Sequence, residues 1–180
     1  MVSKMPEVSV EKANEVIRQA EREDAETVFL LIRSLAESHR GKAGFLATLE
    51  DVRRDGFGKK PLYESWLAET DGNPVGVATF FMTYSTFKGR PCLHLDNLYV
   101  NEGARRFGIA QRLILCICRR AVELNCWRMD LQVEKDNKAR AFYEKIGLSE
   151  TSDRVYAVWD KNLNELAQKD LGTLLSKKVK

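Results

Sequence analysis

The segment from Arg105 to Ala110, which reads RRFGIA, has the residue types of a phosphate-binding loop. It lies between an expected strand and a long expected helix. The free N–H groups of a helix start, the helix dipole and a glycine without a side chain suit a pyrophosphate. Two adjacent arginines would add charge-assisted hydrogen bonds. The spacing is not G-x-G-x-x-G, so a dinucleotide site is not indicated, and an ordinary strand–turn–helix junction is the alternative interpretation.

Two further residues have side chains that could move a proton. Tyr143 follows Phe142 in an expected helix, where a phenol could be a general acid or a half-buried aromatic packed on a sheet. Asp96 stands near the end of the strand that leads to the Arg105 segment. Its carboxylate could be a base, a substrate anchor or an acceptor of loop N–H groups, and a structural role is the alternative.

The apolar spacing predicts an α/β chain that positions these residues. We expect strands at 15–22, 63–69, 75–87, 93–100, 128–134 and 154–159. Helices are expected from 23 or 24 to 37–39, at 49–55, within 105–125 and at 137–145, with Gly56 and Gly58 ending the second helix and Gly147 the fourth. The order implies a mostly antiparallel start and a crossover helix between two later strands.

Strand 128–134 alternates in polarity. Met129, Leu131 and Val133 are expected to face the core, and the side chains of Arg128, Asp130, Gln132 and Glu134 to face solvent. The segment after residue 162 is read as a helix of unclear role.

The composition excludes several classes of protein. With 180 residues, 44% hydrophobic and 31% charged, the chain is expected to form about one globular domain. The net charge is +3, and residues 161–180 carry all of that excess, which argues against nucleic-acid binding by the body of the protein. The longest apolar run is Leu113–Cys118, too short for a membrane span, and we expect no signal peptide.

The cysteines and histidines indicate no metal site. Four cysteines occur without a C-x-x-C pair, and there are two histidines. We therefore expect reduced, packing cysteines and a cytoplasmic protein.

Taken together, the motifs resemble those of a known family. LDNLYV (95–100), then RRFGIA and a helix, then a strand and NKARAFYEKIG (137–147), look like the acetyl-CoA-binding half of a GNAT N-acetyltransferase. That family's loop is Gln/Arg-x-x-Gly-x-Gly/Ala, which Arg105, Gly108 and Ala110 match. Upstream segments 55–69 and 74–90 resemble its diamine, or spermidine/spermine, acetyltransferase subfamily. The resemblance covers roughly residues 15–160.

The resemblance implies a GNAT-like fold: a mixed, mostly antiparallel central sheet flanked by helices, in one domain with a basic tail at about 161–180. It implies that the backbone of Leu98, Tyr99 and Val100 binds pantetheine beside a β-bulge. It also implies that the pyrophosphate lies against the loop and helix start, formed by Arg105, Arg106, Phe107, Gly108, Ile109, Ala110 and Gln111. Tyr143 matches the family's general acid, and Asp96 takes the place of a glutamate that helps deprotonate the amine through water.

Four positions depart from the family pattern. Arg106 stands where glycine is usual, so its side chain points either to solvent or onto a phosphate. Asp136 holds the place of an asparagine and Asn137 follows, and one of these two is expected to cap the next helix near the cofactor. Asp96 is one methylene shorter than glutamate, and Asn97 replaces a carboxylate of polyamine enzymes.

We therefore expect an acetyl-CoA-dependent N-acetyltransferase that acts on a small-molecule primary amine without a metal, as a homodimer. An amino-acid or protein-amine acetyltransferase and a CoA-binding protein without turnover are the alternatives. Substrate contacts are expected from Asn97, His39 and Arg40. The loop after the first helix, ESHRGKAG, is mostly basic, which favours a monoamine that also bears a carboxylate, such as a lysine-like or thialysine-like amino acid, over spermidine.

Overall fold

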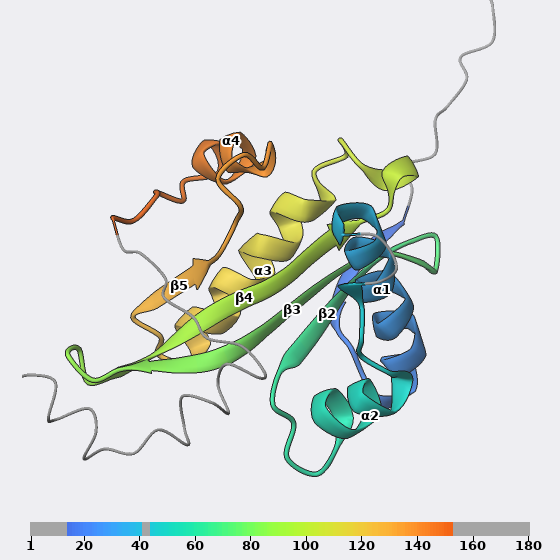
Figure 1. The fold of residues 1–180 in the computed structure, drawn as a ribbon, viewed down its shortest axis with the longest axis horizontal. Helices are drawn as coiled ribbons and strands as arrows, with labels where there is room; N and C mark the ends of the chain where they lie inside the picture. The colour runs from blue at the N-terminus through green and yellow to red at the C-terminus, as the bar shows by residue number, and fades with distance from the viewer. Residues whose placement is uncertain (1–13, 41–43, 153–180) are drawn as a thin grey trace, which may run out of the picture. The chain divides into compact units, whose positions relative to one another are not determined.

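The computed structural model describes residues 14–40 and 44–152, in two units, Met1–Asn137 and Lys138–Lys180. The first unit is built on one five-stranded sheet in the order β1-β2-β3-β4-β5 (Figure 1). The strands are β1 (Glu15–Gln19), β2 (Glu64–Thr70), β3 (Asn73–Ser85), β4 (Arg90–Val100) and β5 (Arg128–Leu131). The first four are antiparallel neighbours, and β5 runs parallel to β4.

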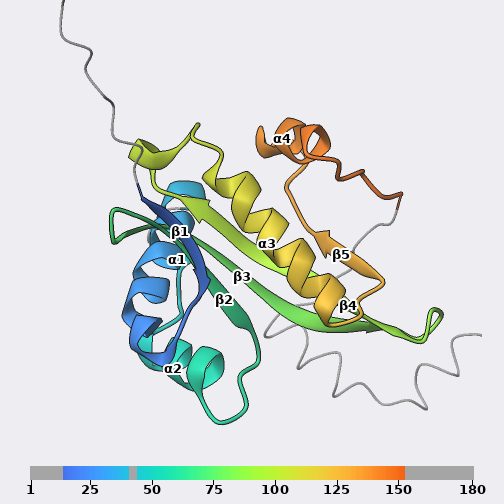
Figure 2. The same cartoon turned by 180° about the vertical axis from the view of Figure 1, so that it is seen from behind.

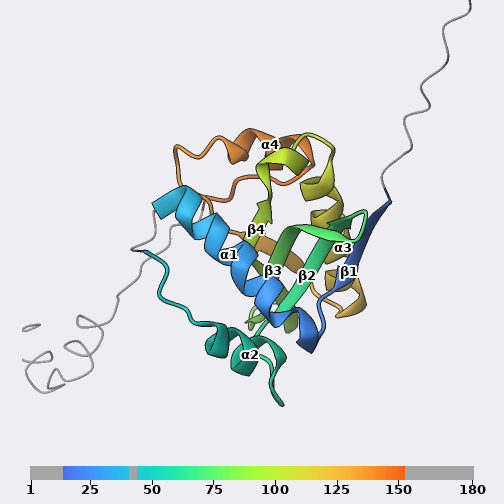
Figure 3. The ribbon, with the colours of Figure 1, turned by 90° about the vertical axis from the view of Figure 1, so that its right-hand side faces the viewer.

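Helices cover both faces of this sheet. On one face lie α1 (Ala25–Arg40) and α2 (Leu49–Phe57), and on the other lies α3 (Ile109–Glu123), as the opposite views in Figures 1 and 2 and the side view in Figure 3 show. Helix α3 makes the crossover from β4 to the parallel strand β5, as the sequence predicted. Short 3₁₀ turns, Arg22–Asp24 and Glu102–Ala104, precede α1 and the loop before α3.

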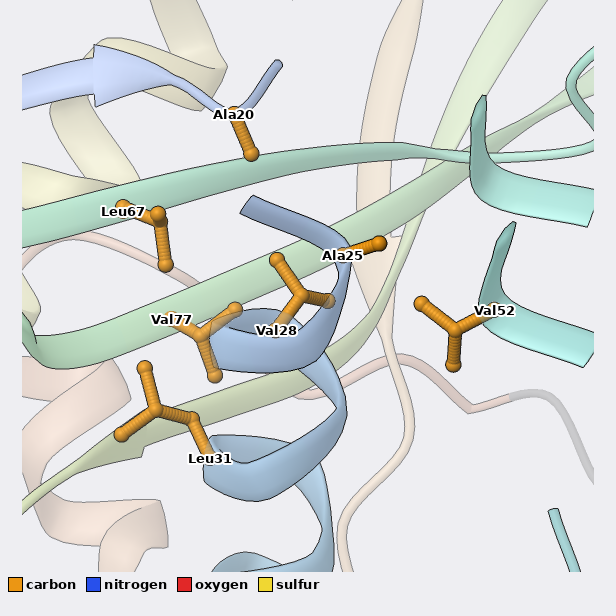
Figure 4. Close-up of a cluster of buried hydrophobic side chains, with 7 residues drawn as sticks. All are labelled: Ala20, Ala25, Val28, Leu31, Val52, Leu67 and Val77. Carbon is orange, nitrogen blue, oxygen red and sulfur yellow. The ribbon is translucent and has the colours of Figure 1, made fainter. Parts of the chain in front are cut away.

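The core under α1 joins that helix to the middle of the sheet. Val28 and Leu31 of α1 pack with Leu67 of β2 and Val77 of β3, and all four are buried (Figure 4). At the edge of this core the Arg18 guanidinium binds Asp24 and Glu69, each at 2.6 Å. The first strand, the 3₁₀ turn before α1 and the second strand are thereby fixed to one another.

A β-bulge interrupts β4 in the middle of the sheet. Thr79 of β3 is opposite Asn97, but Phe80 is opposite Leu95, so Asp96 is the extra residue. Strand β5 pairs with β4 only up to Leu95 and Leu131. Within the described residues β4 therefore continues for five residues, 96–100, with no strand on that side. The resemblance implied a bulge beside residues 98–100, and it lies at Asp96.

The second unit contributes one described helix, α4 (Ala139–Lys145). It ends as predicted, with Gly147 at φ 98°, and the Leu148 N–H donates to the carbonyl of Tyr143 at 3.0 Å. Such a left-handed glycine satisfies the last helical carbonyls. The Arg140 guanidinium pairs with Glu150 at 2.8 Å.

The predicted elements are confirmed in type, with corrections at their ends. Helix α1 continues to Arg40, so Glu37, His39 and Arg40 belong to its last turn and not to a loop. Gly56 lies inside α2, and Gly58 is the C-cap of this helix. A side chain at position 56 would collide with the Tyr63 ring, which would lie 2.9 Å from the added Cβ. Strand β5 ends at Leu131, three residues early. The predicted strand 154–159 and the helix after 162 lie outside the described residues.

Candidate active site

The bulge places a carboxylate and an amide side by side. Asn97 donates from Nδ2 to Oδ2 of Asp96 at 2.7 Å and to Oγ1 of Thr79 at 2.8 Å. Asp96 is exposed, whereas Thr79 is buried. The Asn97 amide is thus fixed by Thr79 of β3, and it in turn fixes the exposed carboxylate of Asp96.

A polar row under α1 and α2 supports this amide. The strand pairing puts Ser65 of β2, Thr79 of β3 and Asn97 of β4 opposite one another on one face. Ser65 and Thr79 are only 4% and 2% exposed. The Ser65 hydroxyl has no hydrogen-bond partner among the described residues. Sequence analysis missed Thr79 because its role depends on pairing between strands that no local pattern reveals.

The open edge of β4 offers main-chain groups beyond the bulge. At the end of the strand, the Val100 carbonyl accepts a hydrogen bond from Nε of Arg105 at 2.9 Å. The Asn101 N–H donates to the carbonyl of Val75 at 2.8 Å. The Arg105 side chain therefore anchors the following loop to the strand. Between the bulge and this anchor, the backbone of Leu98 and Tyr99 can pair with an extended ligand in the manner of an added strand.

The loop before α3 has the backbone shape that suits a phosphate. Gly108 is the N-cap with φ 79°, no side chain caps the helix, and its first turn contains no acidic residue. The N–H groups of the first turn are therefore available to an anion. Arg106 also has a positive φ, 73°, a conformation that costs a non-glycine residue roughly 1–2 kcal/mol. That conformation explains why the family pattern has glycine at this position.

Arg112 holds this loop from the helix side. Its Nη1 donates to the carbonyl of Phe107 at 3.0 Å, and its Nη2 forms an ion pair with Glu15 at the start of β1. The loop is thus tied to the first strand as well as to its own helix. No local pattern indicates this contact, because Arg112 and Glu15 are far apart in the sequence.

Tyr63 is a second phenol that the sequence analysis did not single out. Its ring packs on Gly56, and burial, aided by the carboxylates of Asp55, Asp51 and Asp96, raises the pKa of its hydroxyl. Burial is the main cause of this shift.

The remaining predicted site residues lie on α4, in the turn before it and at the end of α1. Tyr143 lies on α4 in the second unit, and burial raises its pKa, so the phenol keeps its proton at neutral pH. The N-cap of α4 is Lys138, whose side chain makes no capping hydrogen bond, whereas the sequence predicted Asp136 or Asn137 at this helix start. Asn137 instead donates its N–H to the carbonyl of Glu134 at 3.0 Å, closing a turn. His39 and Arg40 end α1, and their side chains are not described.

Among the described residues, no group of His, Cys, Asp and Glu is arranged to hold a metal ion. Nor does that part of the chain contain a helix with the length and apolar run that crossing a membrane requires.

Comparison with known proteins identifies the class to which this fold and loop belong. The model of the acetyltransferase (GNAT) family matches residues 32–148, and the chain belongs to that family. Thialysine N-epsilon-acetyltransferase of Bos taurus is 31% identical over 147 residues, which are 77% of this chain and 86% of the relative. The chain is thus an N-acetyltransferase by family.

Two other similar proteins bear on the fold and on the range of relatives. Spermidine/spermine N(1)-acetyltransferase-like protein 1 of Homo sapiens is 29% identical over 71% of this chain but only 19% of its own length. The solved integron cassette protein of V. cholerae has a TM-score of 0.74 at 23% identity, covering 86% of this chain and 98% of its own. It supports the fold alone.

Proposed function

We propose that the protein transfers acetyl from acetyl-CoA to a small primary amine, with the splayed edge of β4 and the start of α3 as the donor site. The observation that carries the proposal is the combination of an open strand edge with an uncapped helix start a few residues later. An extended thioester arm suits the first, and a pyrophosphate suits the second. Acetyl-CoA contains both, and the family uses it.

In this proposal the donor is held mainly by main-chain groups. Leu98, Tyr99 and Val100 supply the strand edge. The pyrophosphate lies against the loop and first turn of α3, from Arg105 and Arg106 through Phe107, Gly108, Ile109 and Ala110 to Gln111. Asp136 and Asn137 border the donor from the turn before α4. A backbone N–H of the 98–100 segment would stabilise negative charge on the acetyl oxygen.

The acceptor must lose a proton before it attacks. An alkyl amine has a pKa of about 10.4, so forming the neutral amine at pH 7 costs roughly 4.6 kcal/mol. In this proposal Asp96 binds the ammonium, whose proton leaves through water, and Asn97 fixes the carboxylate. Tyr143, whose pKa is raised by burial, holds a proton that it can donate to the leaving thiolate.

We propose a lysine-like acceptor, such as thialysine, with His39 and Arg40 near its carboxylate and Asn97 near its amine. The relatives named for thialysine support this choice. The uncharged Asn97 supports it too, because an enzyme for polycations gains from additional carboxylates at this position. A protein amine is the alternative acceptor.

The test is kcat/KM for thialysine and for spermidine at moderate salt. We expect thialysine to be preferred by tenfold or more. A tenfold preference for spermidine would contradict the acceptor but not the reaction, and binding of CoA without turnover of any amine would contradict the reaction. Asp96→Asn should lower the rate with both amines without changing the KM for acetyl-CoA.

Three further features are part of the proposal. The chain acts as a single N-acetyltransferase domain, as a homodimer and in the cytoplasm. Exposed Met82, Tyr84 and Phe87 near the end of the β3–β4 hairpin support an interface between two copies. Four unbridged cysteines support a reducing compartment. Sedimentation at micromolar protein tests the dimer.

A further inference from the structure

A histidine–carboxylate pair lies on the face of the sheet that carries Thr79 and Asn97. The Nδ1 of His94 on β4 is 2.6 Å from Oδ1 of Asp130 on β5. The other carboxylate oxygen, Oδ2, pairs with Arg128 Nε at 2.8 Å. The alternation of β5 predicted that Asp130 faces solvent, and this is wrong, because its carboxylate is held between two partners and is only partly exposed.

The strand pairing fixes where the imidazole lies. His94 is opposite Phe81 and Asn97 is opposite Thr79, and the two β3 residues, being two apart, share a face. The His94 and Phe81 rings are 5.0 Å apart, which confirms the placement. The extra residue at Asp96 resets the alternation, so His94 and Asn97 occupy one face although they are three residues apart. His94 thus stands at the point where β5 leaves β4, next to the proposed acceptor site.

The hydrogen bond to Asp130 also sets the tautomer of the ring. A carboxylate can only accept, so Nδ1 carries the proton and Nε2 of the neutral ring keeps its lone pair. Nε2 has no hydrogen-bond partner among the described residues, and the side chain is 16% exposed. A base with a free lone pair and a carboxylate behind it is the arrangement that general-base catalysis uses.

We propose that His94, oriented by Asp130, receives at Nε2 the proton that the acceptor amine loses. This inference rests on the proposed function, in which Asp96 binds the ammonium. The N–H bond of the ammonium breaks, its electron pair stays on nitrogen for the attack, and the proton forms a bond to Nε2. Asp130 stabilises the resulting imidazolium, which then releases the proton to solvent. An imidazole suits this step because its ordinary pKa, about 6.5, lies close to neutral pH.

Other charged groups near the ring come from two strands. Cys92 and Asp96 are the titratable neighbours along β4, Arg128 and Asp130 come from β5, and Phe81 and Thr83 of β3 are uncharged. Arg128 is a cation and the two carboxylates are anions, so charges of both signs border the ring along these strands.

The test compares acceptors whose amines differ in pKa. His94→Asn keeps an amide that can donate to Asp130 but removes the basic nitrogen. With thialysine we expect kcat/KM to fall by about 10²–10⁴, the usual size of a general-base contribution. With an acceptor whose amine pKa is near 7, which is already largely neutral, the fall should be less than tenfold. The acid limb of the pH–rate profile should weaken with thialysine, and CoA should still raise the melting temperature.

Asp130→Asn provides a second variant, and it should reproduce the same dependence on amine pKa with a smaller loss. An equal loss with both acceptors would show a structural role for the pair and overturn the proposal. Unchanged kinetics in His94→Asn would overturn it and leave the N-acetyltransferase intact. A wild-type protein that acetylates no amine at all would overturn both.

Discussion

The side-chain amide of Asn97 bridges two strands, with its Nδ2 2.8 Å from the hydroxyl of Thr79 and 2.7 Å from the carboxylate of Asp96. The buried hydroxyl of β3 therefore determines where an exposed carboxylate of β4 is held. The proposed reaction depends on that carboxylate, so a residue that never meets the substrate should influence turnover.

We expect Thr79→Val to lower the free energy of unfolding by about 1 kcal/mol, because a partly buried N–H of Asn97 loses its acceptor. It should also lower kcat by about tenfold at unchanged KM for acetyl-CoA. Thr79→Ser keeps the hydroxyl, so it should keep the wild-type stability and kcat. Urea unfolding and initial rates provide the measurements. Ser65→Ala is the matched control: it removes a buried hydroxyl that has no partner among the described residues, so stability should stay the same or rise. A Thr79→Val enzyme with normal kcat would contradict the positioning role.

Gly108→Ala tests the donor site. At φ 79° a side chain costs roughly 1–2 kcal/mol, and a Cβ would lie 3.2 Å from Arg112 Nη1. We expect the loop to shift and the rise in melting temperature with CoA to be lost. Gly103→Ala is the control in the same segment, because its backbone conformation is ordinary and, apart from its chain neighbours, no atom of the described part of the chain lies within 4 Å of the added Cβ. Equal CoA affinity in the two variants would refute the assignment of the loop.

Arg106→Gly separates the two roles left open for that side chain. Glycine relieves the left-handed strain but adds roughly 0.5–1 kcal/mol of chain entropy, so the melting temperature should hold or rise slightly. If the guanidinium binds a phosphate, CoA affinity falls at low salt and the difference shrinks at high salt. Arg106→Lys keeps the charge and the strain. We expect calorimetry to give weaker CoA binding for glycine than for lysine, and identical affinities would mean that Arg106 faces solvent.

Tyr143→Phe removes the proposed acid. We expect kcat to fall by about 10²–10⁴ while CoA binding stays normal. Burial raises the pKa of this phenol above its usual 10, so the protonated, active form persists as pH rises through the neutral and mildly alkaline range. Any loss of the wild-type rate from Tyr143 ionisation should therefore come at a higher pH than for a free tyrosine. Phe142→Leu is the control for lost aromatic packing, and a similar fall in both variants would argue for packing alone.

The sequence predicted the order of elements well because apolar periodicity is a local property. The apolar run of β3, the helical spacing of α3 and the terminal glycine after α4 each depend on neighbours within a few residues. The end of α2 was misjudged because Gly56 accommodates the ring of Tyr63, which approaches from outside the helix.

The candidate site was predicted only where one segment carries it. The loop around Gly108 is contiguous, so its residue types were enough to indicate an anion site. Thr79, Arg112 and the pair of His94 and Asp130 act across strands or between distant segments, and their partners follow from register. One inserted residue at Asp96 changes which side chains share a face, and no alternating pattern in a single strand reveals it.

The anchors of the loop before α3 have a consequence for how the donor associates. Arg105 fastens the loop to Val100, and Arg112 fastens it to Phe107 and Glu15, all by bonds within the chain itself. The conformational entropy of these residues is therefore lost during folding and not when the donor arrives. Association then resembles docking to a rigid surface, so its rate should follow diffusion and charge steering, with no separate ordering step.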